Sequence, residues 1–298
     1  MKQNIIRNSS LAILLALALT SCSDELEPSP TQQDAKDIPM TFVVNYPGKK
    51  RATETDFEIN DKIGLYVASS DTPLEIGGNL VNNEPLTFDG NQWTASRSLY
   101  WDEGTYNAYA YYPYTKEISS IQDQPFSVSL DQRTQKTDTE LGGYEASDLL
   151  FACSKDVSAS TSPVNLTFKH IMSKLIIRLV KGEDFEGDMP SNATVYIYNT
   201  IPTATIDLEA GVVTRNIKGS RQTIIAHQDY DNIYSAIIVP QRIENRLPLI
   251  EVEIKGVSYI FESKFQFKPG TEHLVNLIIS DNPDKVKIDI GGEIQGWN

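Results

Sequence analysis

Apolar and polar residues alternate along most of this chain, at the period of two that is typical of β-strands. In the first such run Met40, Phe42, Val44 and Tyr46 occupy every second position, and a Pro-Gly pair closes the run. The other predicted strands cover residues 62–67, 106–112, 126–130, 148–153, 164–168, 173–180, 194–198, 234–239, 249–254, 273–279 and 285–290. Gly, Pro, Asn, Asp and Ser separate the runs, and we find no convincing amphipathic helix, so a βαβ fold is excluded.

About a dozen short strands predict an all-β protein built of β-sandwiches. The length of 298 residues suits two domains at roughly 150 residues each. The Ser-rich, apolar-poor stretch 154–163 is the clearest interruption in the series of predicted strands. We therefore predict an N-terminal β-sandwich domain over residues 39–160 and a C-terminal one over residues 161–298.

The first residues have the features of a secretory signal. Lys2 and Arg7 precede the apolar run 11–19, and Leu-Thr-Ser-Cys follows and ends at Cys22. Nine apolar residues reach only about half of a hydrocarbon core of ~30 Å, so the run does not predict a spanning helix. The ending resembles the bacterial lipobox, which predicts that residues 1–21 are removed and that Cys22 is lipidated. The alternative is an ordinary signal peptide with a chance cysteine.

The acidic, Pro-containing stretch 22–38 predicts a flexible tether between the lipid anchor and the folded body. The chain holds 26 Lys and Arg against 40 Asp and Glu, a net charge of −14. That balance repels phosphates and anionic headgroups, so nucleic acid is not an expected partner. Cys153 would be the only cysteine left unmodified, and with three His in the chain a structural zinc site is not expected.

The common catalytic motifs are absent: we find no nucleophile elbow, Walker loop, zinc-protease helix or dinucleotide fingerprint. We therefore expect a protein that is not an enzyme and that binds no cofactor or metal. A hydrolase with two carboxylates stays open as an alternative, because it needs no recognisable motif. The acidic clusters 102–103 and 229–232 could hold calcium or flank a sugar, but such clusters are usually solvated turns.

Residues 100–114 include seven aromatic residues in fifteen positions. As a strand it places Tyr109 and Tyr111 on one face and Tyr106 and Tyr112 on the other. Packing in the core on both faces is the favoured interpretation. The alternative is a glycan platform of Trp101, Tyr109 and Tyr111, because aromatic faces stack on sugar rings.

The chain resembles the fimbrillin (type V pilin-like) family of the Bacteroidales over nearly its whole length. The features that carry the resemblance are, in order, the lipobox, residues 50–57 leading into 61–67, the Tyr-rich residues 108–114, the segment 166–177 and the closing stretch 294–297. The resemblance implies two transthyretin-like β-sandwiches in tandem. It also implies a lipoprotein precursor from which an arginine-specific protease removes the first strand, so that a strand of a neighbouring subunit fills the vacated groove.

The strand that would be removed is residues 40–46, with inward side chains from Met40, Phe42, Val44 and Tyr46. The basic loop that follows offers Arg51 and Ala52 as the bond to be cut, since proteases find exposed, Gly-containing loops. The alternative is a surface hairpin loop with solvated charges. Removing one strand strips backbone partners from its neighbours and opens an apolar cleft, which makes strand addition favourable.

The candidate donor strand lies near the C-terminus, where Val286, Ile288 and Ile290 share one face. Their spacing matches that of the strand they would replace. The alternative is that this strand pairs within its own domain.

The sequence thus predicts a non-catalytic, lipid-anchored protein of the outer membrane and cell surface that serves as a stalk or tip subunit of a fimbria. Its expected partners are other fimbrial subunits and, through Cys22, the lipid bilayer before processing. A host or bacterial surface ligand is a further expected partner. A surface lipoprotein that binds glycans and a fimbrial anchor or accessory subunit are the alternatives.

Overall fold

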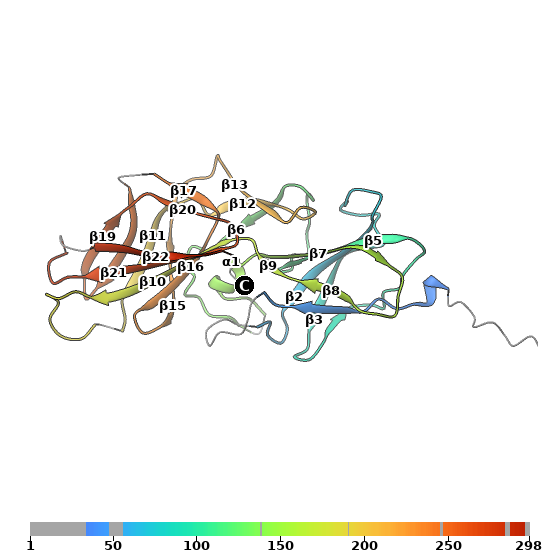
Figure 1. Ribbon diagram of the computed structural model, residues 1–298, viewed down its shortest axis with the longest axis horizontal. Helices are drawn as coiled ribbons and strands as arrows, with labels where there is room; N and C mark the ends of the chain where they lie inside the picture. The colour runs from blue at the N-terminus through green and yellow to red at the C-terminus, as the bar shows by residue number, and fades with distance from the viewer. Residues whose placement is uncertain are drawn as a thin grey trace, which may run out of the picture. The chain divides into compact units, whose positions relative to one another are not determined.

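Nearly all the regular structure of this chain is β-strand, in a computed structural model that describes residues 34–47, 56–137, 139–189, 191–244, 247–283 and 287–295. The all-β class is therefore confirmed (Figure 1). Within the described residues the helices are the 3₁₀ turn η1 (Ala35–Asp37) and the short helix α1 (Gly143–Ser147), neither of which was predicted. The residues from 34 onward form one compact unit.

A six-stranded antiparallel sheet dominates the first half of the chain. Its strands, in spatial order, are β4 (Trp93–Ala95), β3 (Val81–Phe88), β2 (Lys62–Ser69), β5 (Thr105–Tyr112), β7 (Leu150–Ser158) and β9 (Lys169–His170). A separate parallel pair, β1 (Phe42–Asn45) and β8 (Val164–Thr167), contributes side chains to the same buried cluster as this sheet.

The second half of the chain contains a five-stranded and a four-stranded sheet. The five-stranded sheet consists of β15 (His227–Tyr230), β16 (Ile233–Ile238), β10 (Ser173–Lys181), β21 (Thr271–Ile279) and β22 (Lys287–Gln295). The four-stranded sheet consists of β14 (Gln222–Ile225), β11 (Thr194–Thr200), β18 (Pro248–Ile254) and β19 (Val257–Glu262). Inward side chains of the two sheets share one hydrophobic cluster, as in a β-sandwich.

Two small sheets complete the fold. The first is three-stranded and joins distant parts of the chain, with β13 (Val212–Arg215), β12 (Thr203–Asp207) and β6 (Gln124–Ser127). The second is the antiparallel pair of β17 (Gln241–Ile243) and β20 (Phe265–Phe267), between which β18 and β19 intervene in the chain.

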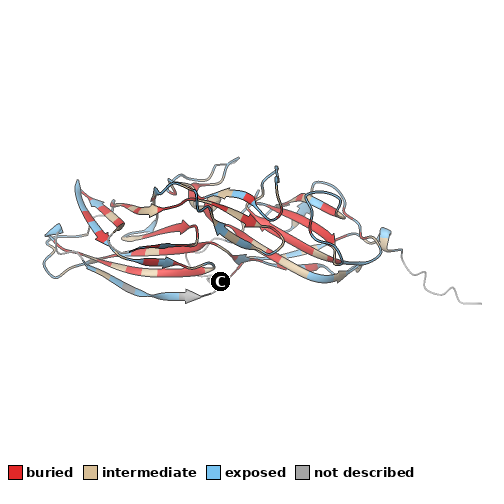
Figure 2. Ribbon diagram, turned by 90° about the horizontal axis from the view of Figure 1, so that it is seen from above, coloured by how far each residue is buried: buried red, intermediate tan, exposed pale blue. Residues whose placement is uncertain are grey.

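The central strands of the six-stranded sheet are buried on both faces (Figure 2). On β5, Tyr106 and Tyr112 belong to one hydrophobic cluster, while Tyr109 and Tyr111 belong to the other. Close packing requires a missing side chain on β2, because a Cβ at Gly64 would lie 2.2 Å from the ring of Tyr111. The two-sided core packing predicted for this strand is confirmed.

The strands on either side of residue 160 share one buried cluster. The domain boundary was predicted within the stretch 154–163, but β7 continues to Ser158. After it, Val164 and Leu166 of β8 are buried in the cluster that also contains Met40. The domain boundary at residue 160 stays a prediction, and the structure shows contacts across it.

Candidate assembly site at the first strand

The segment around β1 is hydrogen-bonded to the body on two sides. Along β1 the backbone N–H of Val164 donates to the carbonyl of Thr41 at 2.8 Å, and that of Phe168 donates to Asn45 at 3.0 Å. Just before β1, Met40 N–H donates to the carbonyl of Leu99 at 2.9 Å. The first strand is thus a paired part of the fold and not a loose end.

The side chains of this segment alternate between core and solvent. Val43 is 42% exposed, whereas Phe42 and Val44 are half-buried and Met40 is 8% exposed. Met40, Phe42, Val44 and Tyr46 all pack on the cluster beneath the six-stranded sheet. The predicted inward face of the first strand is therefore the face that contacts the core, as expected for a strand that covers one side of a sheet.

An aromatic group surrounds the end of this strand. The ring of Tyr46 lies 5.0 Å from that of Phe57 in an edge-to-face contact at 86°. Phe57 in turn makes edge-to-face contacts with Tyr112 and Phe168, both at 5.6 Å, and with Trp93 at 4.9 Å. Such contacts add about 0.5–1.5 kcal/mol per pair beyond the area they bury. Phe57 thus connects the end of the first strand to the core, a role that sequence reasoning missed.

A cavity of about 110 Å³ lies against these rings and is charged on its other side. His170 Nδ1 lies 2.9 Å from the carboxylate Oδ1 of Asp148, and both residues are buried. The Lys136 ammonium donates to Asp61 at 2.8 Å and to Glu58 at 2.9 Å. Burial opposes the charge on Lys136, but the hydrogen bonds to the two carboxylates outweigh it, so its pKa is raised.

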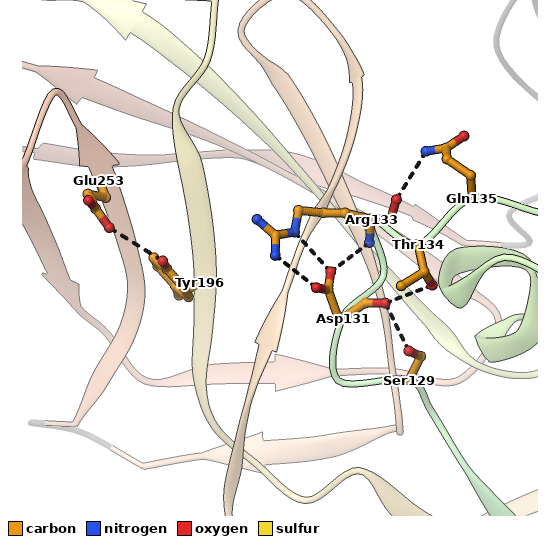
Figure 3. Close-up of polar contacts among 7 residues, drawn as sticks. All are labelled: Ser129, Asp131, Arg133, Thr134, Gln135, Tyr196 and Glu253. Carbon is orange, nitrogen blue, oxygen red and sulfur yellow. Dashed lines mark hydrogen bonds and ion pairs between the residues drawn. The ribbon is translucent and has the colours of Figure 1, made fainter.

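The loop that carries Lys136 is held in place by its own polar contacts (Figure 3). The Arg133 guanidinium donates to both carboxylate oxygens of Asp131, at 2.9 and 2.8 Å. The hydroxyls of Ser129 and Thr134 donate to the Asp131 carbonyl, at 2.9 and 3.2 Å. The bidentate pair lowers the pKa of the Asp131 carboxyl and raises that of Arg133.

A second polar group, also missed by sequence reasoning, lies on the outward side of β11 and β18. The Tyr196 hydroxyl donates to the Glu253 carboxylate at 3.4 Å (Figure 3), and Tyr198 donates to Glu251. The two tyrosine rings are 6.3 Å apart and tilted by 34°. The diagonal pairing follows from the register, in which Tyr196 lies opposite Glu251.

The candidate donor strand pairs within its own sheet, as the alternative interpretation stated. β22 lies at the edge of the five-stranded sheet, antiparallel to β21, and Ile288 is half-buried against the core. A register shift near Gly292, which has φ +139°, interrupts the strand as a bulge. Beyond the bulge Glu293 forms an ion pair with Lys268 at 2.5 Å.

The proposed glycan platform is wrong. Trp101 is 2% exposed and Tyr109 and Tyr111 are each 4% exposed, so no aromatic face is available to stack on a sugar. The density of aromatic residues reflects a strand that is buried on both faces. The Tyr111 hydroxyl also has an internal partner, since it donates to Asn83 at 2.7 Å.

Four predicted site residues lie outside the described residues: the lipidated Cys22, Arg51 and Ala52 of the processing bond, and Val286 of the donor strand. Among the described residues no group of His, Cys, Asp and Glu could hold a metal ion, and no helix is long and apolar enough to cross a membrane. Cys153 is a half-buried free thiol whose pKa is raised by burial, which disfavours the reactive thiolate.

The sheets and the paired first strand define an all-β protein with the packing of a β-sandwich. A model of the fimbrillin-like family matches residues 51–297, so the chain belongs to the fimbrillin-like family. The predicted resemblance is confirmed.

Known relatives agree with this assignment. A Bacteroides ovatus protein, assigned as the fimbrium tip subunit Fim1C, is 24% identical over 225 residues, which are 68% of this chain and 41% of that relative. The chain therefore spans about two fifths of the length of this curated relative.

Two crystal structures share the fold. Both are proteins assigned to cell adhesion, one from Bacteroides ovatus and one from Bacteroides uniformis, with TM-scores of 0.67 and 0.65 and 19% and 20% identity. The alignments cover 86% and 88% of this chain and 97% and 99% of those chains.

Proposed function

We propose that this chain is a structural subunit, stalk or tip, of a cell-surface fimbria, and that it assembles by removal of its first strand and insertion of a strand from a neighbouring subunit. The observation that carries the proposal is the first strand itself, which pairs with β8, is held at Met40 by Leu99 and packs alternate side chains on the core. Membership of the fimbrillin-like family and the likeness to a fimbrium tip subunit support a structural and adhesive role instead of catalysis.

The groove left by residues 40–46, here called the slot, is more stable when another strand fills it. Each fully buried side chain of this size contributes about 1.5–3 kcal/mol, and the half-buried ones contribute less. Loss of the strand also leaves the N–H groups of Val164 and Phe168 without their carbonyl partners. An extended segment that restores both contributions therefore binds favourably by β-strand addition.

The remaining steps of assembly rest largely on residues outside the described ranges, namely Cys22, Arg51, Ala52 and Val286. Lipidation of Cys22 would hold the precursor at the outer membrane, and cleavage between Arg51 and Ala52 would free the strand. Residues 286–290 would then supply the strand for the next subunit, which requires β22 to leave its place beside β21.

Arginine-specific cleavage of the folded full chain tests this function. We expect one early cut after Arg51, followed by oligomers that elute ahead of the monomer in size-exclusion chromatography. Arg51→Gln should prevent both the cut and the oligomers, and Ile288→Asp should permit the cut and prevent the oligomers. A cut protein that stays monomeric at high concentration would contradict assembly by strand exchange.

A further inference from the structure

The four inward positions of the first strand have different surroundings, and the last one, Tyr46, restricts most strongly which side chain can occupy it. Tyr46 contacts Phe57 at 5.0 Å and the His170 ring at 5.8 Å, both edge-to-face. It also lines the charged cavity together with Tyr112 and Asp148. The other three positions are occupied by Met or aliphatic and Phe side chains over a uniformly apolar cluster, where exchange among apolar residues is tolerated.

The surroundings of Tyr46 select for an aromatic ring with a polar edge. Phe57 and Tyr112 present ring surfaces, which favour a third ring over an aliphatic side chain. The Tyr46 ring also covers His170, whose Nδ1 is paired with buried Asp148, and a small residue at this position would open that pair to water. A tyrosine meets both requirements, and a glycine meets neither.

The chain's own candidate donor fits this position less well. With Val286 at the first position, the segment 286–292 places Gly292 at the fourth, where the first strand has Tyr46. A shift by two residues places Ile290 there, so neither alignment supplies an aromatic ring. In β22, Gly292 lies at a bulge and has φ +139°. A bulge interrupts the regular alternation of side chains that a strand in place of β1 needs.

We infer that the preferred replacement for residues 40–46 is a strand from a subunit other than a copy of this chain, and that this chain's own strand binds more weakly. It is an extended segment, parallel to β8, with three alternating apolar residues and then a tyrosine at the position of Tyr46. This inference rests on the proposed strand replacement and adds the direction, the spacing and the residue type by which the slot recognises its partner.

Competition among matched peptides tests the inference on the whole chain nicked after Arg51, with both pieces present. The probes are the peptides 40–46 and 286–292, the latter also as its Gly292→Tyr variant, each with a fluorophore at one end. We expect the Gly292→Tyr peptide and peptide 40–46 to bind at least tenfold more tightly than peptide 286–292. The reversed sequence of peptide 40–46 is the control for direction and should not bind.

The outcomes separate the inference from the function it rests on. Equal binding of peptide 286–292 and its Gly292→Tyr variant would overturn the aromatic requirement while leaving strand replacement intact. Binding by none of the peptides would overturn strand replacement itself.

A second measurement needs no cleavage. In the full chain, Tyr46→Ala removes the ring beside Phe57, and p-cresol in the buffer should raise the melting temperature of this variant by several degrees and leave that of the unmodified chain unchanged. The same melting temperature with and without p-cresol would show that this position does not select a ring.

Discussion

The first and last described strands are both sheet-edge strands with alternating side chains, but the body holds them differently. β1 covers the core with every second side chain, and an aromatic cluster holds its end. β22 lies beside β21 with an extended hydrogen-bonded register, but Lys287, Asp289 and Glu293 are exposed and Ile288 is half-buried. Strand exchange requires a groove that is unstable when empty and a donor strand that detaches easily. The firmly packed β1 suits the first requirement, and the weakly held β22 suits the second.

The largest expected effect comes from placing a charge on each strand. Phe42→Asp should lower the free energy of unfolding by about 3 kcal/mol or more, because it places an unpaired charge against the apolar cluster. Ile288→Asp should cost about 1 kcal/mol, because the charge can reach water at the sheet edge. Guanidinium unfolding curves of the two variants measure the difference, and equal losses would remove the distinction between the edges.

Next in size is the loss of the aromatic anchor. Phe57→Ala should lower the free energy of unfolding by about 3 kcal/mol, since it removes four ring contacts at once. Ile59→Ala is the matched control, because Ile59 is 61% exposed and should change stability by less than about 0.5 kcal/mol. A loss at Phe57 no larger than at Ile59 would show that the end of the first strand is not anchored there.

A smaller, pH-dependent effect is expected at the other edge. His273 of β21 is buried and lies opposite Glu293 of β22. Burial lowers its pKa from the ordinary value of 6.5, while Glu293 opposes and Lys268 assists the shift. The folded state therefore binds the proton less readily than the unfolded state, and stability is complete above about pH 6.5 and falls as the pH drops toward the lowered pKa.

Amide hydrogen exchange measures this effect. Protection of the β22 amides, corrected for intrinsic exchange, should decrease between pH 7 and pH 5, and His273→Gln should flatten the dependence. Unchanged protection in the unmodified chain would contradict the role of His273.

The smallest effect belongs to the exposed ion pair across this edge. Lys268→Ala removes the 2.5 Å contact with Glu293 and should cost only about 0.2–1 kcal/mol, declining as salt is added. The salt dependence of the urea midpoint, compared with that of the unmodified chain, measures it. A cost above about 2 kcal/mol would mean that side-chain contacts hold β22 as firmly as they hold β1.

The hydrophobic periodicity of the sequence predicted which side chains share a strand face, but it did not predict which strands pair. The alternation of residues 40–46 and the two faces of the strand around Tyr109 follow from the pleat and are confirmed. The partner of the first strand, 120 residues away on β8, carries no local signal, because strand pairing depends on the tertiary fold.

The candidate site shows the same limit. Phe57 follows the basic loop in a stretch without strand periodicity, so nothing local marks it as an anchor. The buried Trp101 was a candidate for sugar binding because aromatic density does not reveal which faces are covered. Short strands such as β12 and β13 were missed because each has only two apolar residues, too few to show a period.

The parallel alignment of β1 with β8 has a mechanical consequence for any strand that takes its place. Tension applied along such a strand acts parallel to its own axis and across every rung of the ladder at once, so the rungs must be sheared together instead of being unzipped one by one. A junction of this geometry resists a pull along the strand much better than it resists peeling, which suits the strand replacement proposed above.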